Sequence, residues 1–355
     1  MSRFLCERLA ALAPYTPGEQ PRDQKYVKLN TNESPFPPSP GVVRAAAREA
    51  EALNLYCDPE CTQLRLAAAE LYGVGPQNVL PVNGSDEILY FAFLAFGGKT
   101  RPFAAPDVSY GFYPVYASFC GVPLHKIPLK GNFSIDYRDY CGLSETVLIA
   151  NPNAPTGICL PVWQLEEIVR TNPDNAVIID EAYIDFGGES CVPLIRRYEN
   201  LLVTQTFSKS RSLAGARLGF GVGSEALIRD LTAVKYSINP YNVNRMTQAA
   251  GAAAISDNAY YAENAKKIIE TRAYAAKRLE ELGFTVLPSC ANFLFAGNGR
   301  AEGGELYRAL KRRGVLVRHF DAERISNFCR ITIGTREQMD TLFTAMEAVF
   351  NEKGC

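Results

Sequence analysis

The apolar residues between positions 78 and 223 occur in short continuous runs rather than in alternation with polar residues. The runs are NVLPV, TVLIA, NAVIIDEAY, NLLVTQTF and RLGFGVG, and helical segments separate them. Strands buried on one face alternate in polarity, whereas strands buried on both faces are apolar throughout. The pattern therefore predicts an α/β protein whose mostly parallel sheet lies between layers of helices.

Helical patterning precedes these strands and returns after about residue 250. VVRAAAREAEALNLY and CTQLRLAAAELYG are helical in pattern, and the second stops at Gly73. A long helical run, NAYYAENAKKIIETRAYAAKRLEELG, precedes short strand candidates at NFLFAG, GVLVRHF and CRITIGT. The first forty residues are rich in proline and predict an extended arm. We expect an arm and small-domain segment over 1–39, a large domain over 40–250 and a small α+β domain over 251–355.

The overall charge of the chain excludes some classes of partner. The 355 residues carry a net charge of −1, which gives no global electrostatic basis for binding nucleic acid or acidic membranes. No apolar run approaches the ~20 residues of a membrane helix. The N-terminal segment contains Glu7 and lacks the apolar core of a signal peptide. We expect a cytoplasmic protein with no nucleic-acid or membrane partner.

Cysteine and histidine usage narrows the chemistry. The ten cysteines are scattered without any CxxC, so reduced thiols are favoured over a disulfide framework or a zinc site. The chain has only two histidines, His125 and His319, which tells against a metallohydrolase or a Ser-His-Asp hydrolase. We therefore expect no metal, and chemistry based on lysine, aspartate, tyrosine and arginine.

Two polar segments follow predicted strands, where α/β proteins place their ligands. In VNGSDEILYFAF, Gly84 allows close backbone approach, and the first helical turn after it favours an anion. An N-cap by Ser85 or Asp86 without any ligand explains the same residues. In ANPNAPTG, residues 150–157, a rigid turn could direct the Asn153 amide into the crevice, although turn chemistry explains most of this segment.

Two further segments carry charged groups beside apolar strands. Asp180 follows Val177–Ile179 and should lie at the buried end of a strand, where a carboxylate is costly unless it meets a cation. A structural ion pair or a helix cap is the alternative. Lys209 lies in TFSKSRSLAGARLG, where Thr206, Ser208 and Arg217 offer donors for a phosphate.

Taken together, these groups suit pyridoxal 5′-phosphate (PLP). This cofactor needs a lysine for its aldehyde, an anion facing its ring nitrogen, and donors for its phosphate and its ring oxygen O3′. Lys209 and Asp180 suit the first two tasks, and Tyr183 and Asn153 suit the ring oxygen.

The ordered set NGSDE, NPNAPTG, DEAYIDF, TFSKSRSLAGARLG and RITIGT resembles the fold-type I PLP-dependent aminotransferases. LAPYTPG and LNTNESPFPPSP near the N-terminus make the chain similar to the histidinol-phosphate aminotransferases within that group. Matching pieces run from about residue 15 to about residue 335, which is nearly the whole chain. The resemblance implies a large domain with a mostly parallel seven-stranded sheet between helices, plus a smaller α+β domain.

The resemblance also implies roles for individual residues. Lys209 would form the Schiff base, Asp180 would contact the ring nitrogen, Asn153 and Tyr183 would contact O3′, and Tyr110 would stack on the ring. Tyr56 would reach the cofactor phosphate of the partner subunit in an obligate homodimer. The phosphate would be held by the group Gly84, Ser85, Asp86, Thr206, Ser208 and Arg217.

The substrates implied are a small phosphorylated amine, L-histidinol phosphate, and 2-oxoglutarate, which would yield imidazole-acetol phosphate and glutamate. Arg330 would bind a substrate carboxylate, and Arg318 is a second candidate for binding a substrate anion. Tyr15 would help to hold the substrate phosphate, and Asn153 would also contact the substrate. A surface or structural ion pair is the alternative for Arg318. Two converging arginines suit a dianion better than a monoanion. SKSRSLAG has a small residue, Ser210, where the family's usual SKAFGLAG also has a small residue, but it departs from that pattern at Arg211 and Ser212, which leaves substrate preference open.

Several other functions remain as alternatives. A threonine-phosphate decarboxylase and an aromatic amino-acid aminotransferase share this fold. Gly97-Gly98-Lys99-Thr100 resembles the end of a nucleotide-binding P-loop, but Phe93 stands where that motif requires a glycine. A regulatory PLP-binding protein is disfavoured because no helix-turn-helix segment is appended.

Overall fold

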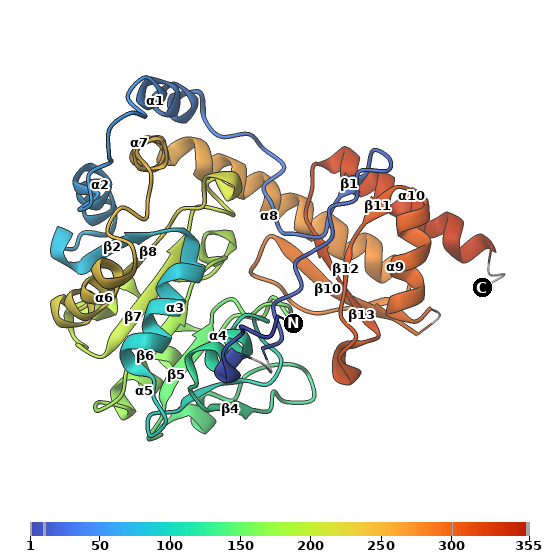
Figure 1. Ribbon diagram of the computed structural model, residues 1–355. Coiled ribbons are helices and arrows are strands. Elements are labelled where there is room, and N and C mark those ends of the chain that lie inside the picture. The colour runs from blue at the N-terminus through green and yellow to red at the C-terminus, as the bar shows by residue number, and fades with distance from the viewer. Residues whose placement is uncertain (1, 10–11, 300, 353–355) are drawn as a thin grey trace.

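A seven-stranded sheet forms the centre of the larger domain (Figure 1). The computed structural model describes residues 2–9, 12–299 and 301–352. Strand β8 is antiparallel to both of its neighbours, and the other strands run parallel to one another. The predicted mostly parallel seven-stranded sheet is therefore confirmed. The strand order is β2 (Val79–Val82), β8 (Gly219–Gly223), β7 (Leu201–Thr206), β6 (Val177–Asp180), β5 (Thr146–Ala150), β3 (Phe103–Pro106) and β4 (Leu124–Ile127).

Helices cover both faces of this sheet. Leu148, Ile178 and Leu202 pack with α3, α4 and α6 on one face, while Val147 and Ile149 pack with α2, α5 and α7 on the other. Because both faces are buried, the central strands β5, β6 and β7 consist mainly of continuous apolar runs, as their sequence indicated. These helices are α2 (Thr62–Tyr72), α3 (Gly84–Phe96), α4 (Tyr113–Cys120), α5 (Val162–Thr171), α6 (Glu225–Ile238) and α7 (Arg245–Ser256).

Helix α1 (Pro40–Ala50) ends earlier than its sequence pattern predicts. Ser39 caps its first turn by accepting from the Val42 N–H at 3.3 Å. Beyond the helix, three backbone carbonyls accept hydrogen bonds from side chains of α6 and α7. Arg245 donates to Ala52, Gln248 to Asp58, and Lys235 to Pro59. The bond from Arg245 takes the Ala52 carbonyl, which a helix continuing to Tyr56 would use, and so opposes the helical propensity of that segment. The other two bonds hold the loop that follows it.

The smaller domain is built on a four-stranded antiparallel sheet, which confirms the predicted α+β character. Its strand order is β12-β13-β10-β9, and the arm contributes β1, which pairs in parallel with β11. The long helix α8 runs from the larger domain into the smaller one (Figure 1). The elements are β1 (Val27–Lys28), α8 (Asn258–Glu281), β9 (Phe284–Val286), β10 (Phe293–Asn298), α9 (Gly303–Arg312), β11 (Val315–Leu316), β12 (Arg318–His319), β13 (Phe328–Thr332) and α10 (Arg336–Glu352).

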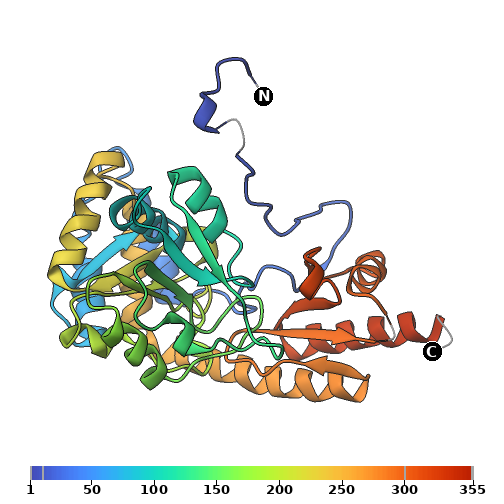
Figure 2. The ribbon, with the colours of Figure 1, turned by 90° about the horizontal axis from the view of Figure 1, so that it is seen from below.

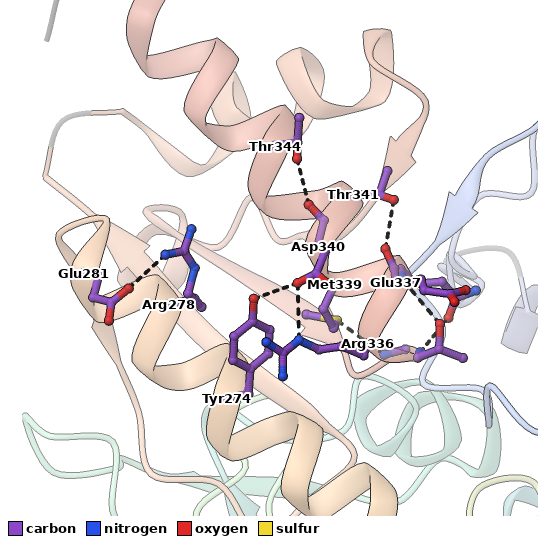
Figure 3. A network of polar contacts seen from close by, with 12 residues as sticks. Tyr274, Arg278, Glu281, Arg336, Glu337, Met339, Asp340, Thr341 and Thr344 are labelled. Atoms are coloured by element: carbon purple, nitrogen blue, oxygen red, sulfur yellow. Dashed lines mark hydrogen bonds and ion pairs between the residues drawn. The ribbon is translucent and has the colours of Figure 1, made fainter.

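Helices α8 and α10 pack together along the smaller domain. Polar contacts on their outer side include a hydrogen bond of 2.6 Å from the Tyr274 hydroxyl to Asp340 and an ion pair of 2.9 Å between Arg278 and Glu347 (Figure 3 shows the former). Exposed ion pairs contribute little to stability, so the apolar contacts beneath them, such as that involving Leu279, carry the packing. Within the described ranges, every helix is too short or too polar to cross a membrane.

The N-terminal arm is an extended trace that leads to the junction of the two domains (Figure 2). It ends in the segment Asn30–Glu33, which lies against both domains. There Asn32 donates to the Tyr183 hydroxyl of the larger domain and to Thr332 of the smaller domain. The arm therefore brings its own residues to the sheet edge where the predicted site residues lie. The three-part division of the chain at residues 40 and 251 stays a prediction.

Candidate active site

The topology brings the predicted motifs to one edge of the large sheet. Parallel strands end at the same edge, so the residues after β2, β5, β6 and β7 meet there. Strand β8 is antiparallel to β7, so its beginning at Gly219, and Arg217 just before it, lie at this same edge. Sequence segments far apart in the chain thus supply one site.

A cavity of about 470 Å³ opens at this edge. Asp180 and Lys209 both line it, as the sequence argument requires. Thr31, Glu33 and Gln20 of the arm close one side. The predicted residues on its wall are Ser85, Asp86, Tyr110, Asp180, Tyr183, Thr206, Ser208, Lys209 and Arg217.

Asp180 is a buried carboxylate with one oxygen unsatisfied. It is 4% exposed, and the Tyr113 hydroxyl donates to its Oδ2 at 2.9 Å. Its Oδ1 has no hydrogen-bond partner. Burial raises the pKa of Asp180 to about 7, with a further increase from the charge of Asp86, while Tyr113 and Lys209 act in the opposite direction. A cation placed beside Oδ1 would offset this cost of burial.

Lys209 lines the cavity three residues after the end of β7. Its Nζ donates to the Thr31 carbonyl at 3.4 Å and lies 5.6 Å from the centre of the Tyr183 ring. Its charge contributes to lowering the pKa of Glu33, although burial and the Lys28 hydrogen bond are the larger influences on that carboxyl. The weak bond to Thr31 leaves the amine available for a ligand.

One end of the cavity gathers donors suited to a phosphate. Arg217 Nη2 donates to Asp86 at 2.9 Å and its Nη1 to Ser208 at 3.4 Å, and the Thr206 hydroxyl donates to Ser208 at 3.0 Å. Gly84 begins α3 with a φ of +73°, and a Cβ there would lie 2.7 Å from Arg217 Nη2. Glycine is therefore required for backbone geometry and for the approach of the guanidinium.

Tyr110 forms part of the aromatic wall of the cavity. Its hydroxyl donates to Asp86 at 2.8 Å, and its ring meets that of Tyr113 edge-on at 5.6 Å. Burial raises the pKa of Tyr110 well above its ordinary value, and the neighbouring Asp86 adds to the increase. The phenol therefore stays neutral and presents its ring face as an apolar surface.

A second cavity of about 630 Å³ adjoins the first, and Tyr110 and Ala154 line both. Tyr15, Arg318 and Arg330 lie on its wall. Arg318 of β12 is directly opposite Arg330 of β13, an arrangement of like charges that costs stability unless an anion binds between them.

The two arginines are held differently. Arg318 donates to the Thr16 and Pro17 carbonyls of the arm at 3.0 and 3.1 Å. Arg330 Nη2 donates to the Asn30 carbonyl at 3.2 Å, while its buried Nε has no partner. Burial lowers the pKa of Arg330, so an anion in this cavity would be bound strongly.

Some predicted site residues lie away from the first cavity. Asn153 Nδ2 donates to the Val108 carbonyl and to Thr156, each at 3.0 Å, and its Oδ1 accepts from Ser109 at 2.8 Å. Tyr56 is 82% exposed and stacks on Tyr241 with 4.6 Å between ring centres. Their contacts with the cofactor stay predictions, as do the roles of the residues that line the cavities.

The two residues that depart from the family pattern point away from both cavities. Arg211 donates to the Ala254 carbonyl at 3.0 Å and to Asn258 at 2.9 Å, and the Ser212 hydroxyl donates to Ser34 at 2.9 Å. Arg211 thus joins the loop after Lys209 to α7 and to the start of α8.

Sequence reasoning missed Tyr113 and the arm residues. Tyr113 begins α4 and lies only three positions after Tyr110, and this closeness to a predicted site residue could have indicated it. Asn32, Thr31 and Glu33 lie within LNTNESP, which was matched to a family segment without any role being assigned. No local pattern indicates that this segment reaches the cavity, because that contact depends on the pairing of β1 with β11.

A lysine and a buried carboxylate that face one cavity at the carboxyl edge of a mostly parallel sheet are the arrangement expected of a fold-type I PLP-dependent enzyme. The chain belongs to the family of aminotransferases of class I and II, whose model matches residues 24–346. It is 50% identical over 342 residues to the histidinol-phosphate aminotransferase of Brachyspira hyodysenteriae, covering 96% of this chain and 97% of the relative. This confirms the resemblance that the motifs indicated.

Solved structures agree with this assignment. The histidinol-phosphate aminotransferase from Sinorhizobium meliloti in complex with PLP matches with a TM-score of 0.83 and 25% identity, over 93% of this chain and 92% of that one. The L-threonine-O-3-phosphate decarboxylase from Porphyromonas gingivalis matches with a TM-score of 0.80 and 20% identity, over 91% and 99% of the chains. The second likeness shows the shared fold alone.

The residues of the first cavity fit PLP. The unpartnered Asp180 Oδ1 is an acceptor that a protonated ring nitrogen would satisfy. Thr206, Ser208 and Arg217 form a cluster of donors at the other end, next to the first turn of α3. The Lys209 amine lies on the same wall as Tyr183, where an aldehyde and a neighbouring ring oxygen would need an amine and a donor.

Proposed function

We propose that this protein catalyses PLP-dependent transamination between L-histidinol phosphate and 2-oxoglutarate, giving imidazole-acetol phosphate and glutamate in histidine biosynthesis. The observation that carries the proposal is the pair of adjoining cavities, one lined by Asp180 and Lys209 and the other by two opposed arginines. Identity of 50% to a histidinol-phosphate aminotransferase over 96% of the chain supports the same reaction.

PLP supplies an electron sink that stabilises negative charge at the substrate Cα. Lys209 acts as the base that takes the Cα proton and as the acid that returns it, since its amine is on the cavity wall and only weakly hydrogen-bonded. Asp180 would hold a proton at the ring nitrogen, and Tyr183 would donate to the ring oxygen. Asn153 would join Tyr183 only by exchanging one of its bonds to Val108 and Thr156 for the ring oxygen. Tyr110 covers the ring with its apolar face and excludes water.

Arg318, Arg330 and Tyr15 bind the anionic group of each substrate in the second cavity. Histidinol phosphate presents a dianionic phosphate there, and 2-oxoglutarate presents a carboxylate. Two guanidinium groups on opposite residues of β12 and β13 offer a fork of donors for such groups. The distance between the two cavities is spanned by the substrate, with its amine directed toward Lys209.

The protein acts as a homodimer in which Tyr56 reaches the cofactor phosphate of the partner subunit. Tyr56 lies outside the cavities of its own chain and is exposed, yet three carbonyls of its loop are fixed by Arg245, Gln248 and Lys235. An exposed aromatic ring on a loop that is held this firmly suits contact with a second subunit. Because the nine described cysteines are all free thiols, the proposed compartment is the cytoplasm.

A panel of amino donors tests the substrate assignment. Each donor is added to the PLP-loaded protein without 2-oxoglutarate, and the loss of the cofactor's visible absorbance is followed. L-Histidinol phosphate should convert the cofactor at least about 100-fold faster at low concentration than L-histidinol, because only the former engages both arginines. Equal rates for the two compounds, faster conversion by phenylalanine, or carbon dioxide release from phosphothreonine would contradict the proposal.

A further inference from the structure

Asn32 occupies the junction between the arm and the two domains. It is 1% exposed and has a φ of +56°. Its Nδ2 donates to the Tyr183 hydroxyl at 2.9 Å. Its backbone N–H donates to Thr332 Oγ1 at 2.9 Å, the Thr332 hydroxyl donates to its Oδ1 at 3.0 Å, and Asn292 donates to its carbonyl at 3.0 Å.

These contacts determine which way the Asn32 amide faces. A threonine hydroxyl has one proton to donate. Thr332 Oγ1 accepts from the Asn32 backbone N–H, so its own proton is directed to the oxygen of the Asn32 side chain. The amide nitrogen must then face Tyr183. In the reversed orientation the amide nitrogen would face Thr332 Oγ1, and the Thr332 proton would lose Asn32 Oδ1, the one acceptor that it has among the described residues.

The orientation of the Asn32 amide in turn determines the direction in which the Tyr183 hydroxyl proton points. An amide nitrogen only donates, so the Tyr183 oxygen accepts from Asn32, and the phenol proton must point elsewhere. Tyr183 lines the first cavity, next to Asp180 and Lys209. The direction left for its proton is therefore the cavity, where the ring oxygen O3′ would lie in the proposed function.

We infer that Asn32 is a positioning residue that directs the Tyr183 hydroxyl proton toward the ring oxygen of the cofactor. The inference rests on the proposed role of Tyr183 and adds a residue from the arm to the reaction. Asn32 is also bound to Thr332 of β13, two residues after Arg330. The orientation of the phenol is therefore set by a residue that both domains hold in place.

A purely structural role for Asn32 is the competing explanation. Asparagine tolerates the left-handed backbone conformation better than most residues, so its φ alone would account for its presence. The bond from Asn292 reaches only its backbone carbonyl and serves that role. The side-chain bond to Tyr183 is not needed for the backbone conformation, which allows the two roles to be separated.

The experiment compares variants of the PLP-loaded protein by titrating the pH midpoint of its visible absorbance. A hydrogen bond donated to an anionic ring oxygen favours the deprotonated chromophore, so loss of the donor raises the midpoint. Asn32→Gly removes the side chain without backbone strain, and Asn32→Asp keeps the shape but turns an acceptor toward Tyr183. Tyr183→Phe removes the proton altogether. Asn292→Ala removes a bond to the backbone of Asn32 and serves as the matched control.

We expect Tyr183→Phe to raise the midpoint by roughly one pH unit, the effect of one hydrogen bond to a charged group. Asn32→Gly and Asn32→Asp should also raise the midpoint. The double variant Asn32→Gly/Tyr183→Phe should have the same midpoint as Tyr183→Phe alone. Asn292→Ala should leave the midpoint unchanged even where it lowers the melting temperature.

Two results would overturn the inference in distinguishable ways. If Tyr183→Phe raises the midpoint while both Asn32 variants leave it at the wild-type value, Asn32 has a structural role only and the proposed function stands. If Tyr183→Phe itself has no effect, Tyr183 does not contact the ring oxygen, and that part of the proposed function fails together with the inference.

Discussion

At Gly84, one added methyl group should weaken cofactor binding in addition to lowering the stability of the fold. A Cβ at Gly84 would lie 2.7 Å from Arg217 Nη2 and displace the guanidinium from the proposed phosphate site. Gly84→Ala should weaken PLP binding by about tenfold or more, measured by absorbance titration of the cofactor-free protein. Gly121→Ala is the matched control, because Gly121 has a φ of +67° and nothing within 4 Å of a Cβ.

Both glycine variants should lose stability by about 1 kcal/mol from the left-handed backbone. Only Gly84→Ala should lose cofactor affinity. Equal PLP dissociation constants for the two variants would show that Arg217 does not need its observed position to hold the phosphate.

Glu181 gives a prediction about pH. It accepts from Cys191 N–H, Ser190 and Gln205 at 2.6, 2.6 and 2.8 Å, and burial raises its pKa from 4.5 to about 7. Between these values the folded protein binds more protons than the unfolded chain, so the free energy of unfolding should fall as the pH rises through this window. Glu181→Gln cannot ionise at this position. Between pH 5 and pH 8 its free energy of unfolding should therefore fall by on the order of 2–3 kcal/mol less than that of the wild-type protein.

Urea unfolding of both proteins at several pH values, at a fixed PLP concentration, measures this difference. Parallel curves for wild type and Glu181→Gln would mean that the buried carboxyl does not titrate in this range. Asp180, whose pKa is also raised, is present in both proteins and cancels in the comparison.

At the residue scale, the sequence indicated Asp180 and Lys209 because a carboxylate ending an apolar strand and a lysine among small hydroxyls are locally unusual. It did not indicate Tyr113 or Asn32. The Tyr113 hydroxyl contacts Asp180, and Asn32 contacts Tyr183, only after the chain has folded. A polar residue whose partner is distant in sequence carries no local signature of that contact.

At the scale of elements, strands β12 and β13 place Arg318 opposite Arg330, and this gives the next prediction. An anion bound between the two guanidinium groups should relieve their repulsion and stabilise the protein. Inorganic phosphate should raise the melting temperature of the PLP-loaded protein above its value in chloride at equal ionic strength. Arg318→Gln should lose most of this increase, since one guanidinium alone binds phosphate less well.

Thermal unfolding in both salts provides the measurement, and Arg229→Gln, which alters an exposed arginine far from the cavity, is the control. An identical phosphate effect in wild type and Arg318→Gln would remove Arg318 from the anion site.

Strands made of β-branched and other large apolar residues were predictable from sequence, and element boundaries set by tertiary contacts were not. Strands β5, β6 and β7 lie where the apolar runs placed them. Strands β3 and β4 were missed because FAAP contains alanine and proline, which are depleted in strands, and because half of LHKI is polar. The end of α1 was placed too late, because the bonds from Arg245, Gln248 and Lys235 to the following loop come from residues nearly two hundred positions away.

For the whole molecule, the proposed exchange of Tyr56 between subunits predicts complementation. A Lys209→Ala subunit lacks the base, and a Tyr56→Ala subunit lacks a phosphate contact for its partner. In a mixed dimer, one site receives Lys209 from the second subunit and Tyr56 from the first, so it is complete. Unfolding the two variants together and refolding them should restore about a quarter of wild-type activity, as expected when half the dimers carry one intact site of two.

Refolding each variant alone should give much less activity than the mixture. An activity equal to the average of the separate variants would place Tyr56 outside the partner's site. Size-exclusion chromatography with light scattering on the same samples confirms that dimers formed.

The claim that Lys209 holds the cofactor in the cavity lined by Asp180 is tested most directly by reducing the PLP-loaded protein with borohydride and mapping the modified peptide by mass spectrometry. Reduction fixes the cofactor to the amine that holds it. We expect the added mass on Lys209 alone, and we expect none in the Lys209→Ala protein, whose visible absorbance should also be lost. Cofactor found on any other lysine, or an unchanged spectrum in Lys209→Ala, would contradict the account.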